Sequence, residues 1–171
     1  MDCSLKISSH LGGWGCVLCC GGILVFVAAA IIPGLDDRQS RQRANEASAV
    51  ATLRTVTTLQ RKYAAAHPEK GFACELPRLR PPEQAQDADY NPLGFLITRT
   101  HSGYKFALVN CHSEANGEIA HYQATAVPAV RGATGFKAFC TDDSGLLWYD
   151  AAGSATDCLT SRRSPAIFDW R

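Results

Sequence analysis

Apolar residues run without interruption near the start of the chain and become periodic afterwards. Residues 14–32 contain no charged side chain and are almost entirely apolar. As a helix, these 19 residues would span about 28 Å, close to the roughly 30 Å of a bilayer hydrocarbon core. This pattern predicts a transmembrane helix over residues 14–33, preceded by a short polar leader, residues 1–13. The alternative is a removed secretory signal peptide, although Pro33 and Gly34 stand where a small-residue cleavage site would follow.

A second, amphipathic helix is predicted over residues 36–67. Its apolar positions recur every three or four residues, as expected for one face of a helix packed on a core: Ala49, Leu53, Val56, Leu59/Gln60 and Tyr63. Arg54, Arg61 and Lys62 lie off this stripe. Pro33 and Gly34 are expected to kink or end the first helix, and if Pro33 only kinks it, the two segments form one helix of some 50 residues.

The pattern of residues in the remainder of the chain predicts a loop followed by strands. Residues 68–93 are polar and rich in proline, which favours a surface loop with one short turn around residues 72–76. Strands are expected at residues 94–100 (weakly), 104–110, 118–128, 136–141 and 146–149, because apolar positions there alternate or form short runs between turn residues. Asn116-Gly117 is a strong hairpin signal, and residues 142–145 carry the composition of a second turn.

These elements together predict an α+β fold. A long N-terminal helix, membrane-spanning in its first half and kinked at Pro33, is expected to pack on an antiparallel sheet of about four strands within residues 94–171. A sheet needs one face covered, and the amphipathic helix would cover it.

The eight cysteines divide into two groups. Cys74, Cys111, Cys140 and Cys158 lie in the part after the apolar run, where two disulfides in one of three pairings are expected. A bridge between Cys140 and Cys158 would attach the C-terminal tail to the last hairpin. Free thiols and a zinc site are the alternatives. The other four, Cys3, Cys16, Cys19 and Cys20, lie in or before the apolar run and are interpreted as small packing residues.

Charge and motifs exclude several function classes. The net charge of +1 without a basic run disfavours nucleic-acid binding, and neither the nucleophile-elbow, dinucleotide, P-loop nor zinc-protease motif is present. Cys111 and His112 are neighbours on a predicted strand and would point to opposite faces. His101, His112 and His121 are candidates for a histidine site, but exposed histidines on a sheet are the commoner outcome. Asp142-Asp143 is a candidate calcium site, but a plain turn is the commoner outcome there. No enzyme activity, cofactor, metal or small-molecule substrate is expected.

Two stretches resemble type IV pilin-like proteins, closest to the acidobacterial type. The first comprises Ala-Ala-Ala-Ile-Ile-Pro at residues 28–33 and the run Asn-Glu-Ala-Ser-Ala-Val-Ala-Thr-Leu-Arg-Thr-Val at residues 45–56; the second is residues 132–149, similar to the closing hairpin of those proteins. The resemblance covers roughly residues 25–65 and 104–150. It implies leader removal at Gly12 or Gly13, and helix packing through small residues: Gly15, Gly21, Gly22, Ala28, Ala29 and Ala30.

One departure from the family pattern is plain. Pilins carry a glutamate near the start of the mature helix that helps to register subunits in the filament, whereas no acidic residue lies between Asp2 and Asp36 here. We therefore expect a non-canonical or minor pilin-like subunit or assembly factor of a type IV pilus or type II secretion-like filament. The alternative is a single-pass inner-membrane protein whose periplasmic binding domain does not assemble.

The expected surroundings follow from these features. The partners would be the lipid bilayer and pilin-like subunits, in a bacterial inner membrane or a cell-surface filament. Three arginines after the apolar run, Arg38, Arg41 and Arg43, favour a cytoplasmic C-terminal domain by the positive-inside rule. The resemblance and the disulfide-like cysteines favour the periplasmic side, which we adopt.

Overall fold

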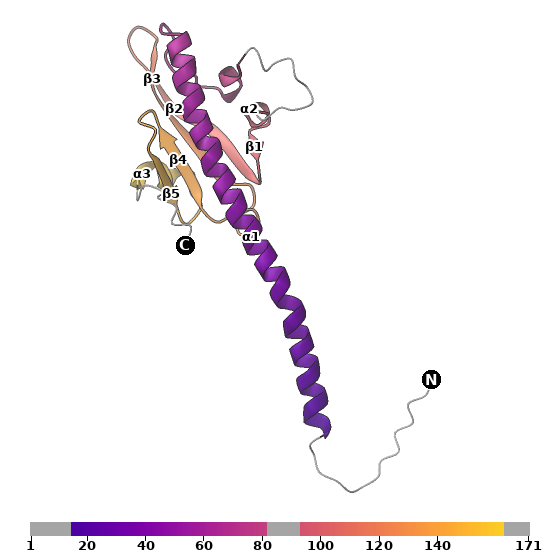
Figure 1. Ribbon diagram of the computed structural model, residues 1–171. Coiled ribbons are helices and arrows are strands. Elements are labelled where there is room, and N and C mark those ends of the chain that lie inside the picture. Colours follow the sequence, from indigo (N-terminus) through magenta and orange to yellow (C-terminus); the bar gives the residue numbers. More distant parts are fainter. Residues whose placement is uncertain (1–14, 82–92, 163–171) are drawn as a thin grey trace. The chain divides into compact units, whose positions relative to one another are not determined.

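The computed structural model describes the backbone of residues 15–81 and 93–162, and the side chains of residues 37–81 and 93–162. The chain divides into two compact units, Met1–Gln39 and Ser40–Arg171. The second unit contains the sheet, the C-terminal part of the long helix and all the contacts discussed below (Figure 1).

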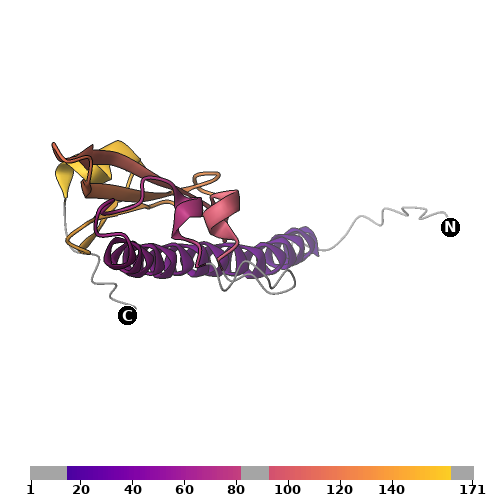
Figure 2. The ribbon, with the colours of Figure 1, turned by 90° about the horizontal axis from the view of Figure 1, so that it is seen from above.

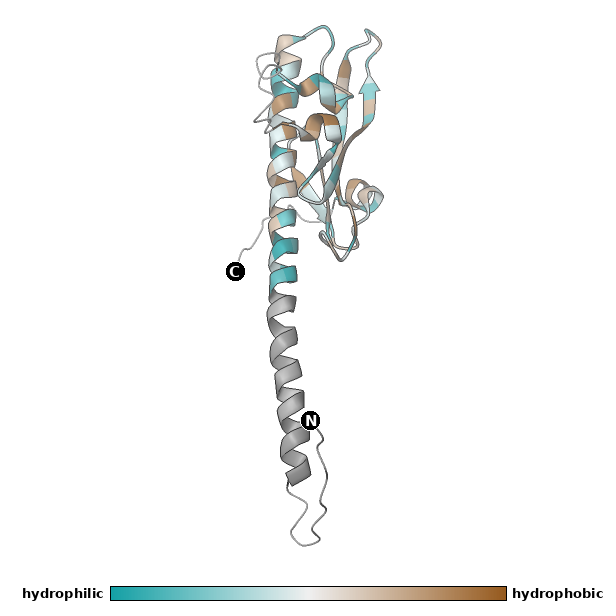
Figure 3. Cartoon of the chain, turned by 90° about the vertical axis from the view of Figure 1, so that its right-hand side faces the viewer, coloured by the Kyte–Doolittle hydropathy of each residue, from teal (hydrophilic) through white to brown (hydrophobic). Residues whose placement is uncertain are grey.

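Helix α1 is one helix, Gly15–Ala66, of 52 residues. A single helix agrees with the alternative in which the two predicted helical segments are joined. Helix α1 ends one residue before the predicted end at residue 67. The next turn closes at once, because His67 N and Gly71 N donate hydrogen bonds back to Tyr63 O and His67 O. Residues 37–41, where the described side chains of α1 begin, are all exposed, and this part of the helix is coloured as hydrophilic in Figure 3.

The predicted apolar stripe of α1 is confirmed. Ala49, Leu53 and Val56 are almost completely buried, Leu59 and Gln60 are buried beside them, and Tyr63 packs at the edge of the same cluster. Arg54, Arg61 and Lys62 are exposed, as expected. Burial of one face of α1 is therefore what fixes this part of the helix to the sheet.

The sheet is antiparallel with the strands in sequence order. Its strands are β1 (Thr100–His101), β2 (Tyr104–Ser113), β3 (Ile119–Pro128), β4 (Ala138–Asp142) and β5 (Leu147–Asp150). Short turns join β1 to β2, β2 to β3 and β4 to β5, including the predicted hairpin at Asn116-Gly117, where Gly117 adopts φ +86°. A longer loop, residues 129–137, joins β3 to β4. The sheet thus has five strands rather than about four.

Two predictions in this region need correction. Residues 94–100 do not form a strand: helix α2 (Phe95–Thr98) precedes the two-residue β1. Phe95 and Leu96 are both buried, which a helical turn allows and an alternating strand does not. The tail also contains an unpredicted helix, α3 (Ala155–Ser161).

The larger core lies between α1 and one face of the sheet. The strands contribute buried aromatic side chains, Tyr104 and Phe106 of β2, Tyr122 of β3 and Phe139 of β4, and Phe95 of α2 joins them. The segment after α1 completes it through the short helix η1 (Leu76–Leu79), whose two leucines are buried. The predicted turn in the loop therefore lies slightly later than residues 72–76.

Gln60 connects α1 to that segment through its fully buried side chain. Its Nε2 donates to Ala73 O at 2.7 Å, and its Oε1 accepts from Ala73 N at 2.8 Å. A buried amide satisfied at both ends costs little to bury. The glutamine therefore pairs with Ala73 as a neighbouring strand would.

The opposite face of the sheet is covered only in part, by α3 (Figure 2). A second, small core forms there from Cys140, Trp148 and Cys158, with Leu159 packed against it. Ser154 caps α3, because its Oγ accepts from Asp157 N at 3.2 Å. Next to α3, the end of the same face is polar.

Candidate functional site

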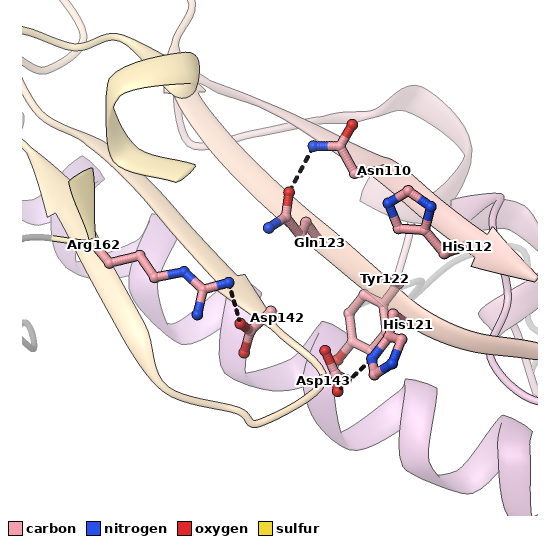
Figure 4. A pocket seen from close by; sticks show the side chains of 8 residues that line it. All are labelled: Asn110, His112, His121, Tyr122, Gln123, Asp142, Asp143 and Arg162. Atoms are coloured by element: carbon pink, nitrogen blue, oxygen red, sulfur yellow. Dashed lines mark hydrogen bonds and ion pairs between the residues drawn. The ribbon is translucent and has the colours of Figure 1, made fainter. Parts of the chain in front are cut away.

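A polar pocket of about 370 Å³ lies at this polar end of the sheet face, beside the C-terminus of α3 (Figure 4). It is the best candidate for a functional site among the described residues. Strands β2 and β3, the end of β4 with the turn that follows it, and the residue after α3 supply its lining: Asn110, His112, His121, Tyr122, Gln123, Asp142, Asp143 and Arg162.

An irregularity in β2 shapes one wall of the pocket. The pairing of β2 with β3 shifts register between Val109 and His112, and Asn110 in that interval adopts φ +50°. Bulges of this kind redirect side chains and are frequent next to functional sites. Here Asn110 Nδ2 donates to Gln123 Oε1 at 2.6 Å, which places two amides side by side at the pocket wall.

The end of β4 and the turn that follows it supply two carboxylates, Asp142 and Asp143. Asp142 is buried, and its Oδ1 accepts from the backbone N and the Oγ of Ser144, at 3.0 and 2.5 Å. Its Oδ2 lies 3.4 Å from Arg162 Nη2. The carboxylate that a calcium ion would need is therefore already engaged by the chain's own donors. No group of three or more metal-ligating side chains occurs within the described residues.

Two of the three histidines considered from the sequence come together. His112 and His121 are register partners across β2 and β3, and His121 Nδ1 lies 3.1 Å from Asp143 Oδ2. His101 is elsewhere, on β1 beside the ring of Phe95, with 6.2 Å between ring centroids. The pocket thus combines two imidazoles with the half-buried carboxylate of Asp143.

Cys111 cannot act as the nucleophile of a Cys–His pair, because its sulfur is bonded to Cys74. Burial raises the pKa of the Tyr122 hydroxyl, and the side-chain hydrogen bond to Thr57 lowers it only in part. Tyr122 therefore stays protonated at neutral pH. The pocket presents amide, imidazole, carboxylate and guanidinium groups, a set suited to hydrogen bonding and ion pairing.

The predicted disulfides are confirmed, and the structure selects one of the three pairings. Cys74 joins Cys111, and Cys140 joins Cys158, each with 6.0 Å between Cα atoms. The first bond attaches the segment after α1 to β2, and the second attaches α3 to β4. Zinc and free thiols are therefore the wrong interpretations for these four cysteines.

The other predicted site residues lie outside the part of the structure that describes side chains. This holds for the cleavage residues Gly12 and Gly13, for the kink residues Pro33 and Gly34, and for the small packing residues of the apolar run. Where side chains are described, from residue 37 to 81 and from 93 to 162, no helix is long and apolar enough to cross a membrane. The span at residues 14–33 therefore stays a prediction.

Sequence reasoning missed Asn110, Gln123 and Arg162 as pocket residues. Asn110 and Gln123 meet only because of the β2 bulge, for which the sequence carries no distinct signal. Arg162 reaches Asp142 only because α3 returns the tail to the sheet. An indirect signal existed in Ser154 and Asp157, which are spaced as a helix N-cap pair.

Comparison with known proteins identifies no relative: no family model, no curated protein and no solved structure matches the chain.

Proposed function

We propose that this chain is a pilin-like structural subunit or assembly factor of a bacterial filament of the type IV pilus or type II secretion kind. The observation that carries the proposal is that α1 combines a predicted membrane-spanning segment and a segment that packs on the sheet. One helix of 52 residues begins in the uncharged apolar run and ends as the helix that covers the sheet. A filament subunit needs such a helix, first as an anchor in the membrane and later as a packing element between subunits.

The cysteines support a location outside the cytoplasm. Both disulfides lie in the sheet unit, and structural disulfides persist in oxidising compartments such as the periplasm. They therefore favour a periplasmic C-terminal unit over the orientation suggested by the three arginines after the apolar run.

The second candidate is a membrane-anchored binding protein that never assembles. Two observations favour it: no acidic residue lies between Asp2 and Asp36, and the sheet carries the polar pocket at Asn110 and His121. In this alternative the apolar helix is a permanent anchor, and the pocket would carry the binding function.

Processing of the leader separates the two candidates. The full chain would be expressed with and without a prepilin peptidase, and the intact mass and N-terminus of the membrane-extracted protein measured. The filament proposal predicts a new N-terminus at Gly13 or Trp14 only when the peptidase is present. Gly12→Val and Gly13→Val variants should locate the cleavage, since only the residue preceding the cut is required to be glycine.

A matched control is Gly15→Val, which lies beyond both predicted cleavage positions. It should leave the peptidase-dependent mass change intact. An unprocessed Met1 in the presence of active peptidase would reject the filament proposal and favour the permanent anchor. Release of the chain from membranes by alkaline carbonate would reject both candidates.

A further inference from the structure

An exposed apolar and basic loop lies at the end of the sheet unit where α1 enters it. Residues 129–137, here called the basal loop, connect β3 to β4. Val130 and Phe136 at its surface are 59% and 47% exposed, and the guanidinium of Arg131 lies 5.9 Å from the centre of the Phe136 ring. Single exposed apolar residues are ordinary, but here two accompany a basic side chain on one short loop.

The basal loop is held firmly against α1. Gln42 Nε2 donates to Gly132 O at 2.5 Å, and Asn45 Nδ2 donates to Thr134 O at 2.9 Å. Glu46 Oε1 accepts from the backbone N of Phe136 at 3.0 Å. These three hydrogen bonds, all from about one turn of α1, fix the loop backbone. The exposed side chains of the loop therefore project from an ordered backbone.

The charge around the basal loop is mainly basic. Arg131 and Lys137 belong to the loop, and Arg41 and Arg43 lie on the exposed side of the adjoining turn of α1, where the exposed acid Asp37 precedes Arg41 by about one helical turn. The nearby acid Glu46 is buried and forms an ion pair with Lys137 at 3.7 Å. Basic side chains beside exposed apolar ones are the composition that favours an anionic bilayer interface.

The chain also limits how far this loop can be from the predicted span. Gln42, which holds Gly132, follows Ile32 by ten residues. Ten residues reach at most about 35 Å even when fully extended, and about 15 Å as a helix. If residues 14–32 occupy a bilayer, the chain length alone therefore keeps Gln42 within about 35 Å of the end of the span.

We propose that the basal loop docks on the surface of the bilayer that holds residues 14–32, with Val130 and Phe136 in the headgroup region and Arg131 on anionic lipid phosphate. This inference rests on the membrane anchor common to both candidate functions. Before assembly, the docked loop would hold the sheet unit on the membrane rather than leave it free on a tether.

Lipid photocrosslinking tests this directly. The full chain would be reconstituted into phosphatidylcholine vesicles with or without phosphatidylglycerol, carrying a benzoylphenylalanine at Val130. The matched control carries the same group at Leu146, which is 57% exposed. Leu146 lies next to the β4–β5 turn, where Ser144 O accepts from Arg61 near the other end of the described helix. Mass spectrometry would identify the adducts.

We expect lipid adducts at Val130 and none above background at Leu146. Removing one basic charge near an anionic surface should lower binding by about fivefold, so Arg131→Gln should reduce the adduct yield by about that factor in phosphatidylglycerol vesicles. The same change should matter little in vesicles of phosphatidylcholine alone.

The outcomes separate this inference from the proposed function. Chains that do not float with the vesicles would reject the anchor itself. Chains that float but give no lipid adduct at Val130, or equal adducts at both positions, would overturn the docking while leaving the anchor intact. Crosslinks from Val130 to a second copy of the chain would identify the basal loop as a subunit contact and would also overturn it.

Discussion

The two faces of the sheet are covered by different means. On one face, α1 contributes a continuous buried stripe that includes Leu53 and Val56, and this packing is supplemented by side-chain hydrogen bonds such as that of Gln60. On the other, the seven residues of α3 bury little more than Cys158 and are joined to β4 by a disulfide. The comparison teaches that a short helix with little apolar area to bury needs a covalent bond to stay in place.

The largest expected effect is on the α1 face. Leu53 is fully buried, and Leu53→Ala should lower the free energy of unfolding by about 2–5 kcal/mol because it removes packed methyl groups and leaves a cavity. Urea unfolding of the full chain, followed by the loss of sheet structure, would measure it. The exposed neighbour offers the control: Arg54→Ala should change stability by less than about 0.5 kcal/mol. Equal losses for the two variants would contradict the role given to packing.

On the other face, loss of the Cys140–Cys158 disulfide should come next. Its cysteines are 18 residues apart, and closing a loop of about this length contributes about 3 kcal/mol in the chain-entropy model. In the Cys140→Ser/Cys158→Ser variant, amides of α3 should lose hydrogen-exchange protection, while those of α1 from residue 49 to 60 should keep theirs. Simultaneous loss in both helices would mean that the two faces are not independent.

A smaller change concerns the cap of α3. Ser154→Ala removes the acceptor of the hydrogen bond from Asp157 N, and a lost N-cap typically costs about 1 kcal/mol. With the disulfide intact, we expect this variant to loosen α3 only, as seen by hydrogen exchange. Thr156→Ala, two residues further along in the first turn of α3, removes no capping hydrogen bond and serves as the comparison. A change in α1 protection would count against the independence of the two faces.

The smallest effect at neutral pH concerns Tyr104, on the α1 face. Burial raises the pKa of its hydroxyl, with a lesser contribution from the charge of Glu46. Because the folded pKa lies above the unfolded one, the stabilisation is fully present below the ordinary value of 10.0 and decreases as pH rises above it. Unfolding midpoints in urea should therefore fall above pH 10, and less steeply in Tyr104→Phe. Urea midpoints of the unsubstituted chain that do not change above pH 10 would contradict this role of Tyr104.

Local patterns predicted the stripe of α1 and the hairpin turns well, and they predicted very short elements and contacts between distant segments poorly. The stripe of α1 and the Asn116-Gly117 hairpin are properties of neighbouring residues, so the sequence displays them. Phe95 and Leu96 were misread as strand residues because a four-residue helix is too short to show a period. The pocket depends on a bulge at Asn110 and on the return of Arg162 to Asp142, contacts that only the folded chain creates.

Gln60 gives α1 a property that apolar side chains cannot supply. Its amide both donates to and accepts from Ala73, so the pairing is satisfied at a single rotation of the helix about its own axis. Glutamate lacks the donor, leucine lacks both groups, and asparagine is one methylene shorter. This one side chain therefore helps to determine which side of α1 faces the segment that follows it, within the unit Ser40–Arg171.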